Sequence, residues 1–139
     1  TGDHPGSGHD SDDGEIVVVD IDSLAVTDRI AIGGSPNGFP AGVDPAGHRV
    51  FLANNESGIT VYDYATREVI RGTEDPVLPE GTVTDSYYTG VLYDAATDLL
   101  FVSDFSGDAV HVVEGSGAFS FIRTLEGSDG PGFLLLVEE

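Results

Sequence analysis

The sequence predicts an all-β protein built from repeated antiparallel units. Residues 43–54 return fifty positions later as residues 93–104, and each copy has the pattern of a strand, a tight turn and a second strand. Short runs rich in Val, Ile, Phe and Tyr alternate with Gly, Pro, Asn and Asp, as expected of half-buried strands. Helical periodicity of apolar residues is absent. A unit repeating at this period must stack on its neighbours to bury its apolar face.

Eleven short apolar runs are expected to be strands, because turn-forming residues bound each of them. Two runs precede the first repeat, four belong to each repeat, and the last run is Phe-Leu-Leu-Leu-Val. In chain order the expected strands are residues 15–20, 26–32, 39–43, 49–53, 59–62, 68–71, 87–93, 99–103, 109–113, 119–125 and 133–137.

A three-residue signature orders these strands into larger units. Val-Val-Asp at residues 18–20 recurs as Val-Tyr-Asp at 61–63 and, more weakly, as Val-Val-Glu at 112–114. With four strands a to d in each unit, the chain runs c–d, then a–b–c–d twice, then a. Four-stranded antiparallel sheets repeated radially form a β-propeller, so the sequence predicts propeller blades, about two and a half to three of them.

Closure of such a ring needs more strands than this chain supplies. Propellers contain about four to eight blades, and an open stack leaves sheet edges unpaired. Either the rest of a longer polypeptide or further copies of the chain complete the ring. The first alternative is favoured, because no strand b follows residues 133–137. In both cases we expect contacts at residues 16–19 and 133–137.

Part of the repeat resembles a known family. Pro36-x-Gly38 and residues 42–63, GVDPAGHRVFLANNESGITVYD, resemble the YVTN-type β-propeller repeat. The resemblance covers residues 15–125 and is strongest over 33–72; in the second copy Ala95 and Thr97 replace the Pro and Gly of the turn. Such repeats occur in archaeal surface-layer-type proteins and bacterial secreted proteins, and a related propeller group includes lactonases. The resemblance therefore implies an extracellular or cell-surface location.

The charge composition is extreme. The 139 residues include 25 Asp and Glu, five Arg and no Lys, for a net charge of −20. At about 1 M salt the Debye length falls to roughly 3 Å, so self-repulsion of this size is largely screened. The composition favours a halophilic protein over an ordinary acidic secreted or calcium-loaded one, and together with the resemblance it implies a haloarchaeal source. Nucleic-acid partners are excluded, because phosphate binding needs clustered Lys and Arg.

Length and composition also bound the organisation of the chain. Residues 1–14 contain mainly Gly, Ser, Asp and His and are expected to form a flexible acidic tail, followed by the repeat segment 15–139. Two histidines in the tail, His4 and His9, stand beside acids, but a pair without further ligands binds zinc or copper weakly. No apolar run approaches 18 residues, so no transmembrane helix is expected.

Acidic loops supply the candidate metal ligands. The loops that join strands b and c of the two repeats, residues 54–58 and 104–108, and the connection 73–86 should emerge on one face of the propeller. On that face Glu56, Asp104 and Asp108 are the candidate ligands for calcium. A solvated acidic surface accounts for the same residues and is favoured in so acidic a chain. Further carboxylates expected on this face are Glu74, Asp75, Glu80 and Asp85.

No catalytic constellation is apparent in the sequence. There is no Gly-x-Ser-x-Gly motif and no Cys. His111 alternates with valines on an expected strand and is interpreted as a surface or packing residue, and His48 lies in a turn. The sequence therefore favours a noncatalytic extracellular or cell-surface module for protein interaction or self-association. The alternative is a lactonase-like enzyme acting on a small molecule at the channel mouth, and calcium is the one candidate cofactor.

Overall fold

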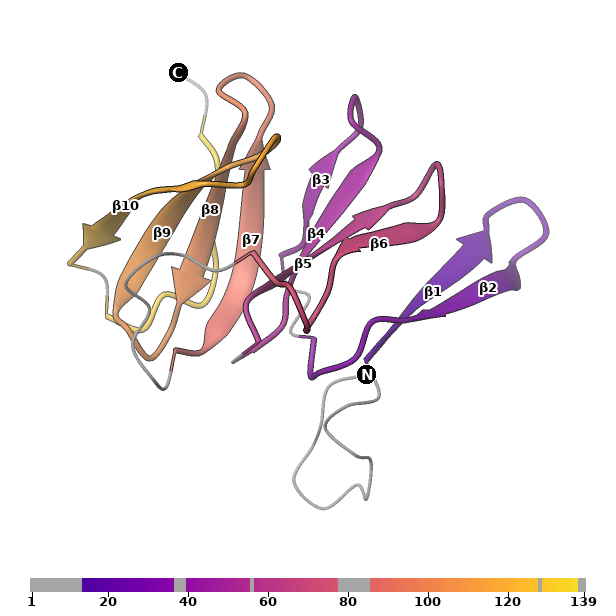
Figure 1. The fold of residues 1–139 in the computed structure, drawn as a ribbon, viewed down its shortest axis with the longest axis horizontal. Helices are drawn as coiled ribbons and strands as arrows, with labels where there is room; N and C mark the ends of the chain where they lie inside the picture. Colours follow the sequence, from indigo (N-terminus) through magenta and orange to yellow (C-terminus); the bar gives the residue numbers. More distant parts are fainter. Residues whose placement is uncertain (1–13, 37–39, 56, 78–85, 128, 138–139) are drawn as a thin grey trace, which may run out of the picture.

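A computed structural model describes residues 14–36, 40–55, 57–77, 86–127 and 129–137 (Figure 1). Within these ranges the chain forms ten strands and no helix. It therefore contains no helix long and apolar enough to cross a membrane in its described part. The strands are β1 (Glu15–Asp20), β2 (Ala25–Ala31), β3 (Gly42–Asp44), β4 (Arg49–Ala53), β5 (Ile59–Asp63), β6 (Glu68–Arg71), β7 (Tyr88–Asp94), β8 (Leu99–Asp104), β9 (Ala109–Glu114) and β10 (Phe121–Glu126).

Two of the three sheets are four-stranded and antiparallel, with neighbours in chain order. The first blade has the order β3-β4-β5-β6 and the second blade β7-β8-β9-β10. The strands β1 and β2 form a separate pair, here called the N-terminal hairpin. Figure 1 shows the three sheets side by side in a row, with the N-terminal hairpin at one end. The all-β class and the four-stranded, propeller-like blades are confirmed.

The prediction of a last strand at residues 133–137 is wrong. Residues 133–137 do not form a strand and have no ladder partner among the described residues. Instead, residues 134–136 line a groove together with Leu92, Phe101 and Val110 of the second blade. These three residues belong to the neighbouring strands β7, β8 and β9, so the segment lies over the face of the blade. A segment that crosses the face of a sheet cannot pair with an edge strand, and residues 133–137 therefore form no ladder.

The boundary of the expected tail moves by one residue. Gly14 was placed in the tail 1–14, but it is buried and its carbonyl accepts hydrogen bonds from the N–H groups of Ile32 and Gly33 at 2.8 and 3.1 Å. A Cβ at this position would lie 2.4 Å from the carbonyl oxygen of Gly33, so only glycine fits. Gly14 therefore belongs to the fold, whereas residues 1–13 lie outside the described ranges.

One turn design recurs in five hairpins. Each begins with an Asp whose carboxylate accepts backbone N–H groups of the turn, as the Asp44 carboxylate does from Ala46 and Gly47. Four positions later a residue with positive φ redirects the chain into the next strand. The pairs are Asp20 and Leu24, Asp44 and His48, Asp63 and Arg67, Asp94 and Asp98, and Asp104 and Asp108.

The core lies between the two blades. Strand β7 packs against β3 and β4, and the fully buried Phe51 stands between Tyr93 and Phe119, with ring centroids 5.6 and 6.3 Å away. Gly42 permits this approach, because a Cβ there would lie 3.3 Å from the backbone nitrogen of Tyr93. The remaining core members are Ala53, Ile59, Val61, Val77, Tyr88, Val91, Leu100, Val102 and Val113.

Candidate functional site

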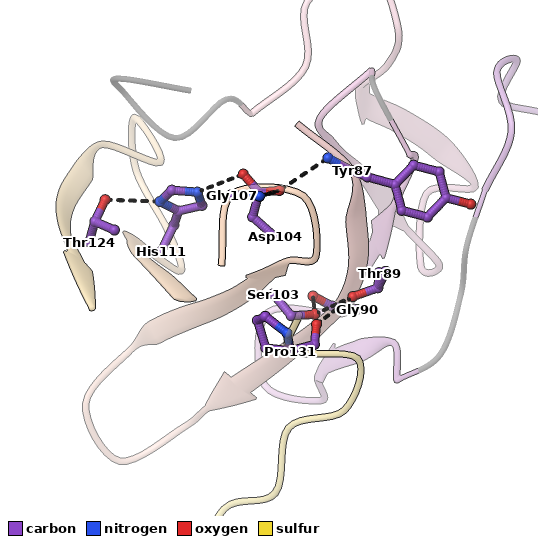
Figure 2. A network of polar contacts seen from close by, with 9 residues as sticks. All are labelled: Tyr87, Thr89, Gly90, Ser103, Asp104, Gly107, His111, Thr124 and Pro131. Carbon is purple, nitrogen blue, oxygen red and sulfur yellow. Dashed lines mark hydrogen bonds and ion pairs between the residues drawn. The ribbon is translucent and has the colours of Figure 1, made fainter. Parts of the chain in front are cut away.

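The most elaborate polar cluster in the described chain centres on Asp104, the last residue of β8. Its side chain is buried, with a residue exposure of 1%. One carboxylate oxygen accepts hydrogen bonds from the backbone N–H groups of Gly107 at 3.0 Å and Tyr87 at 3.1 Å (Figure 2). Asp104 thus joins its own b–c turn to the segment that leads into β7.

His111 extends the cluster across β9 to β10. Its Nε2 lies 3.3 Å from the second carboxylate oxygen of Asp104, and its Nδ1 lies 3.0 Å from Oγ1 of Thr124 (Figure 2). Because a carboxylate only accepts, Nε2 carries the hydrogen, and in the neutral ring Nδ1 accepts from the Thr124 hydroxyl. The imidazole therefore connects three successive strands of the second blade.

The Asp104 carboxylate is held in its charged form. Burial acts to raise the pKa of Asp104, but hydrogen bonds from the backbone of Gly107 and Tyr87, with those from Ser86 and His111, outweigh it and lower the pKa below its ordinary value. The negative charge is thus balanced by donors that the fold aims at it, as expected of a buried ionised group.

The first blade contains a neutral counterpart of the same arrangement. Asn54 directly follows β4, at the position that Asp104 occupies at the end of β8. The Nδ2 atom of Asn54 donates to Oγ1 of Thr60 at 3.4 Å. Thr60 pairs with Leu52 in the first blade, and His111 pairs with the corresponding Val102 in the second. The two blades therefore use one structural position, a polar side chain after strand b bonded to strand c, with different residues.

A second polar cluster attaches the C-terminal segment. The Thr89 hydroxyl donates to the carbonyl oxygen of Pro131 at 2.9 Å and lies 2.9 Å from the hydroxyl of Ser103 (Figure 2). The Ser103 hydroxyl donates in turn to the carbonyl oxygen of Gly90 at 3.2 Å. These bonds hold the chain at Pro131 against the start of β7.

The Asp104, His111 and Thr124 side chains have the connectivity of a carboxylate–imidazole–hydroxyl triad. However, His111 is 5% exposed and Asp104 is fully enclosed, so a substrate has no route to the imidazole in this conformation. The Asn54 and Thr60 pair joins the end of strand b to strand c at the same position of the first blade without a titratable group.

The candidate calcium ligands have different surroundings. Glu56 lies outside the described residues, so the full set is untested and stays a prediction. Asp104 is turned inward as described above, and the Asp108 side chain accepts the N–H of Gly130 at 2.9 Å. The described ranges contain no group of three or more His, Asp or Glu side chains placed to hold a metal ion.

Of the other carboxylates expected on that face, Glu74 and Asp75 lie in the described ranges. Asp75 forms an ion pair with Arg71, which is four residues earlier, and Glu80 and Asp85 lie outside the described ranges. His48 has φ +57° in its turn and makes an edge-to-face contact with Tyr64, at 5.4 Å between ring centroids. The tail histidines His4 and His9 are outside the described residues.

The sequence analysis missed the joint role of Asp104 and His111. Alternation with Val110 and Val112 identified His111 as a packing or surface residue, whereas it is buried in a polar chain. The available signal was the internal repeat, because aligning residues 50–54 with 100–104 places Asn54 on Asp104. Both residues stand at the end of strand b, where the Asp104 carboxylate accepts the turn N–H of Gly107 and the Asn54 amide donates to Thr60 and to the carbonyl oxygen of Gly33.

Two apolar grooves flank the stack. The N-terminal groove, about 560 Å³, separates the N-terminal hairpin from the outer face of the first blade, and the C-terminal groove, about 380 Å³, lies between the second blade and the C-terminal segment. The first is lined by Glu15–Val19, Ile32, Pro36, Val50, Leu52, Tyr62 and Tyr64. The second is lined by Leu92, Phe101, Val110, Leu125–Gly127 and Leu134–Leu136.

Comparison with solved structures supports the fold. The chain is similar to a structure titled Kuenenia stuttgartiensis hydrazine synthase, with a TM-score of 0.68 and 21% identity. The match covers 86% of this chain and 32% of that chain, so the present chain spans about a third of its length. No protein-family model and no curated protein matches. At this identity the likeness concerns the fold alone.

Proposed function

We propose that this chain is a noncatalytic β-propeller module that mediates protein interaction or assembly at the cell surface or outside the cell, in a high-salt environment. The observation that carries the proposal is the apolar surface at both ends of the stack. At one end Val17 and Val19 are 41% and 48% exposed, and at the other Phe133 and Leu135 are 80% and 84% exposed. Apolar side chains gathered in this way mark surfaces that bind other protein.

The charge composition supports the high-salt setting. A net charge of −20 with five Arg and no Lys opposes compaction at low ionic strength and is tolerated once screened. The resemblance of residues 33–72 to YVTN-type repeats supports the extracellular placement and an archaeal source.

The noncatalytic character is supported by the enclosure of the most polar cluster. The functional groups of Asp104 and His111 are occupied by protein partners, and Asn54 with Thr60 repeats the arrangement without a titratable group. A catalytic base needs access to substrate, which this burial denies.

A lactonase-like enzyme is the second candidate, and one observation favours it. His111 lies between a carboxylate and the Thr124 hydroxyl at 3.3 and 3.0 Å, which is the connectivity of an activated nucleophile. Opening of β10 would be required to admit a substrate to Thr124.

Two measurements test the proposal. First, we expect no hydrolysis of a panel of lactones above buffer, with or without calcium, in high salt. Turnover that disappears in the variant Thr124→Ala, with Thr27→Ala as an exposed control, would favour the enzyme instead. Second, protease added to intact producing cells should digest the chain. Protection of the chain until the cells are lysed would contradict the surface location.

A further inference from the structure

The N-terminal hairpin lacks the neighbours that its counterparts have. The sequence signature aligns β1 with β5 and β9, the third strands of the two blades. Both β5 and β9 have a strand on each side, whereas within the described ranges β1 pairs with β2 alone. Among these residues the other edge of β1 has no ladder partner, and such an edge is a template for a further strand.

Burial at equivalent positions shows what is missing beside β1. Tyr62 of β5 and Val113 of β9, the counterparts of Val19 in the signature, are 2% and 0% exposed, whereas Val19 itself is 48% exposed. The three strands have similar apolar sequences, so the difference comes from the absence of a covering layer, not from composition. An added strand would remove this apolar area from water.

The N-terminal groove continues an interface that already exists in the molecule. One face of the first blade packs on β7, and its opposite face presents Val50, Leu52 and Tyr62 to the groove. Tyr62 is 2% exposed and its hydroxyl has no hydrogen-bond partner among the described residues, so a polar group of the groove wall is left unpaired there. The stacking of one blade on the next predicts another β layer at this place.

The chain itself carries a segment that suits the groove. In residues 133–137 exposure follows the period of a strand, because Phe133, Leu135 and Val137 are 80%, 84% and 72% exposed while Leu136 is 42% exposed and Leu134 is half-buried. One side of the segment covers the second blade and the other faces solvent. Its backbone has no ladder partner in the described structure.

The segment of one molecule lies far from the groove of the same molecule. In Figure 1 the C-terminal segment is beside the second blade, and β1 is at the opposite end of the row. Contact between the two sites therefore requires a second copy. Such a contact is head-to-tail, since each copy offers a groove at one end and a segment at the other.

We propose that the free edge of β1 and the N-terminal groove bind residues 133–137 of a second copy by strand addition. The inference rests on the proposed assembly function and specifies its partner and site. Backbone pairing and apolar burial supply the attraction. All copies carry the same charge of −20, so association requires salt that screens their repulsion.

The test uses the 139-residue chain and two blocking variants, analysed by sedimentation velocity in about 3 M KCl. Val17→Asp places a charge in the groove, and Leu135→Asp places one on the exposed side of the segment. We expect wild type to form oligomers and each variant alone to associate at least tenfold more weakly. Mixing the two variants should restore a one-to-one dimer, because one copy retains the groove and the other retains the segment.

The mixture also shows that both variants are folded. Val26→Asp is the matched control, since Val26 on β2 is 52% exposed and lies outside the groove, and it should associate as wild type does. Amide exchange should slow at β1 on association. A monomeric wild type, a mixture that does not dimerise, or protection at β2 in place of β1 would overturn the inference. None of these outcomes bears on the protease and lactone measurements that test the proposed function.

Discussion

At the scale of residues, the acidic side chains have a structural role besides their charge. The pKa values of three turn aspartates are lowered, chiefly by a hydrogen bond from a Ser hydroxyl, a Thr backbone N–H or a Thr hydroxyl of the same turn. Each ionised carboxylate thus stabilises its turn relative to the unfolded chain. The aspartates and these first partners are Asp20 with Ser23, Asp63 with Thr66 and Asp94 with Thr97.

This leads to a prediction for acid pH. Because these pKa values and that of Asp104 are lower in the folded state, their stabilisation is complete above the unfolded value of 3.8 and is lost as the pH falls through the folded values. In high salt, thermal melts should therefore change little from about pH 7 to 5 and fall steeply below about pH 4. A melting temperature that stays constant down to about pH 2 would contradict this role.

The Asp104 cluster supports a second prediction. Asp104→Ala leaves the N–H groups of Gly107 and Tyr87 and the ring of His111 without their acceptor, so we expect a loss of about 1–3 kcal/mol in unfolding free energy. Asp104→Asn should lose less, since Asn occupies the equivalent position 54. Urea unfolding in high salt measures both, with Asp22→Ala in an exposed turn as control. An equal loss of unfolding free energy in Asp22→Ala would show that removal of a negative charge, and not the loss of these hydrogen bonds, causes the effect.

At the scale of elements, blade packing depends on close backbone approach. Gly42 at the start of β3 touches Val91 and Tyr93 of β7, and the N–H of Val91 donates to the carbonyl oxygen of Pro40 at 2.8 Å. The aromatic ring of Phe119 adds a contact with the Arg49 guanidinium, 5.8 Å from its centroid. The N–H of Tyr88 also donates to the carbonyl oxygen of Asn55 at 3.1 Å, and the Arg71 guanidinium lies 6.0 Å from the Phe119 centroid. The interblade contact therefore combines apolar burial with backbone hydrogen bonds and cation–π contacts.

Gly42→Ala tests this packing. The added Cβ would lie 3.3 Å from both the Tyr93 nitrogen and Cγ1 of Val91, so the blades must separate by a few tenths of an ångström. We expect destabilisation of about 1–3 kcal/mol, as for an overpacked core. Gly132→Ala is the control, because a Cβ there meets nothing within 4 Å. Calorimetric melts that are the same for both variants would show that the blades tolerate the methyl group.

At the scale of the whole molecule, charge repulsion is not offset by ion pairs. Three arginines form surface pairs, Arg29 with Glu15, Arg67 with Asp28 and Arg71 with Asp75. Exposed pairs of this kind contribute little, about 0–1 kcal/mol each. Against a net charge of −20, stability must therefore depend on screening by the solvent.

We accordingly expect the melting temperature to rise steeply with salt. Most of the rise should occur below about 1 M, because the Debye length is by then roughly 3 Å. Circular dichroism melts from about 0.1 to 3 M KCl measure it, with sucrose as an uncharged cosolvent control. Equal stabilisation by sucrose, or a flat profile in KCl, would count against charge repulsion as the cause.

The local features of this protein were determined by its sequence. The short apolar runs of β4, β5 and β8, the aspartates that open the turns and the fifty-residue repeat can each be recognised from neighbouring residues or from the repeat itself. Such signals specify strands and hairpins without knowledge of the rest of the fold. For that reason the all-β class, the four-stranded blades and ten of the expected strands agree with the structure.

Only the tertiary structure decided which side chains meet. The sequence identified Asp104 as a candidate ligand and His111 as a packing residue, but their contact depends on the register of β8 against β9. The segment 133–137 has the composition of a strand, yet it pairs with no strand in the described chain and lines a groove on a face of the second blade instead. Pairing and burial depend on partners distant in sequence, and one chain's local pattern does not specify whether those partners are present.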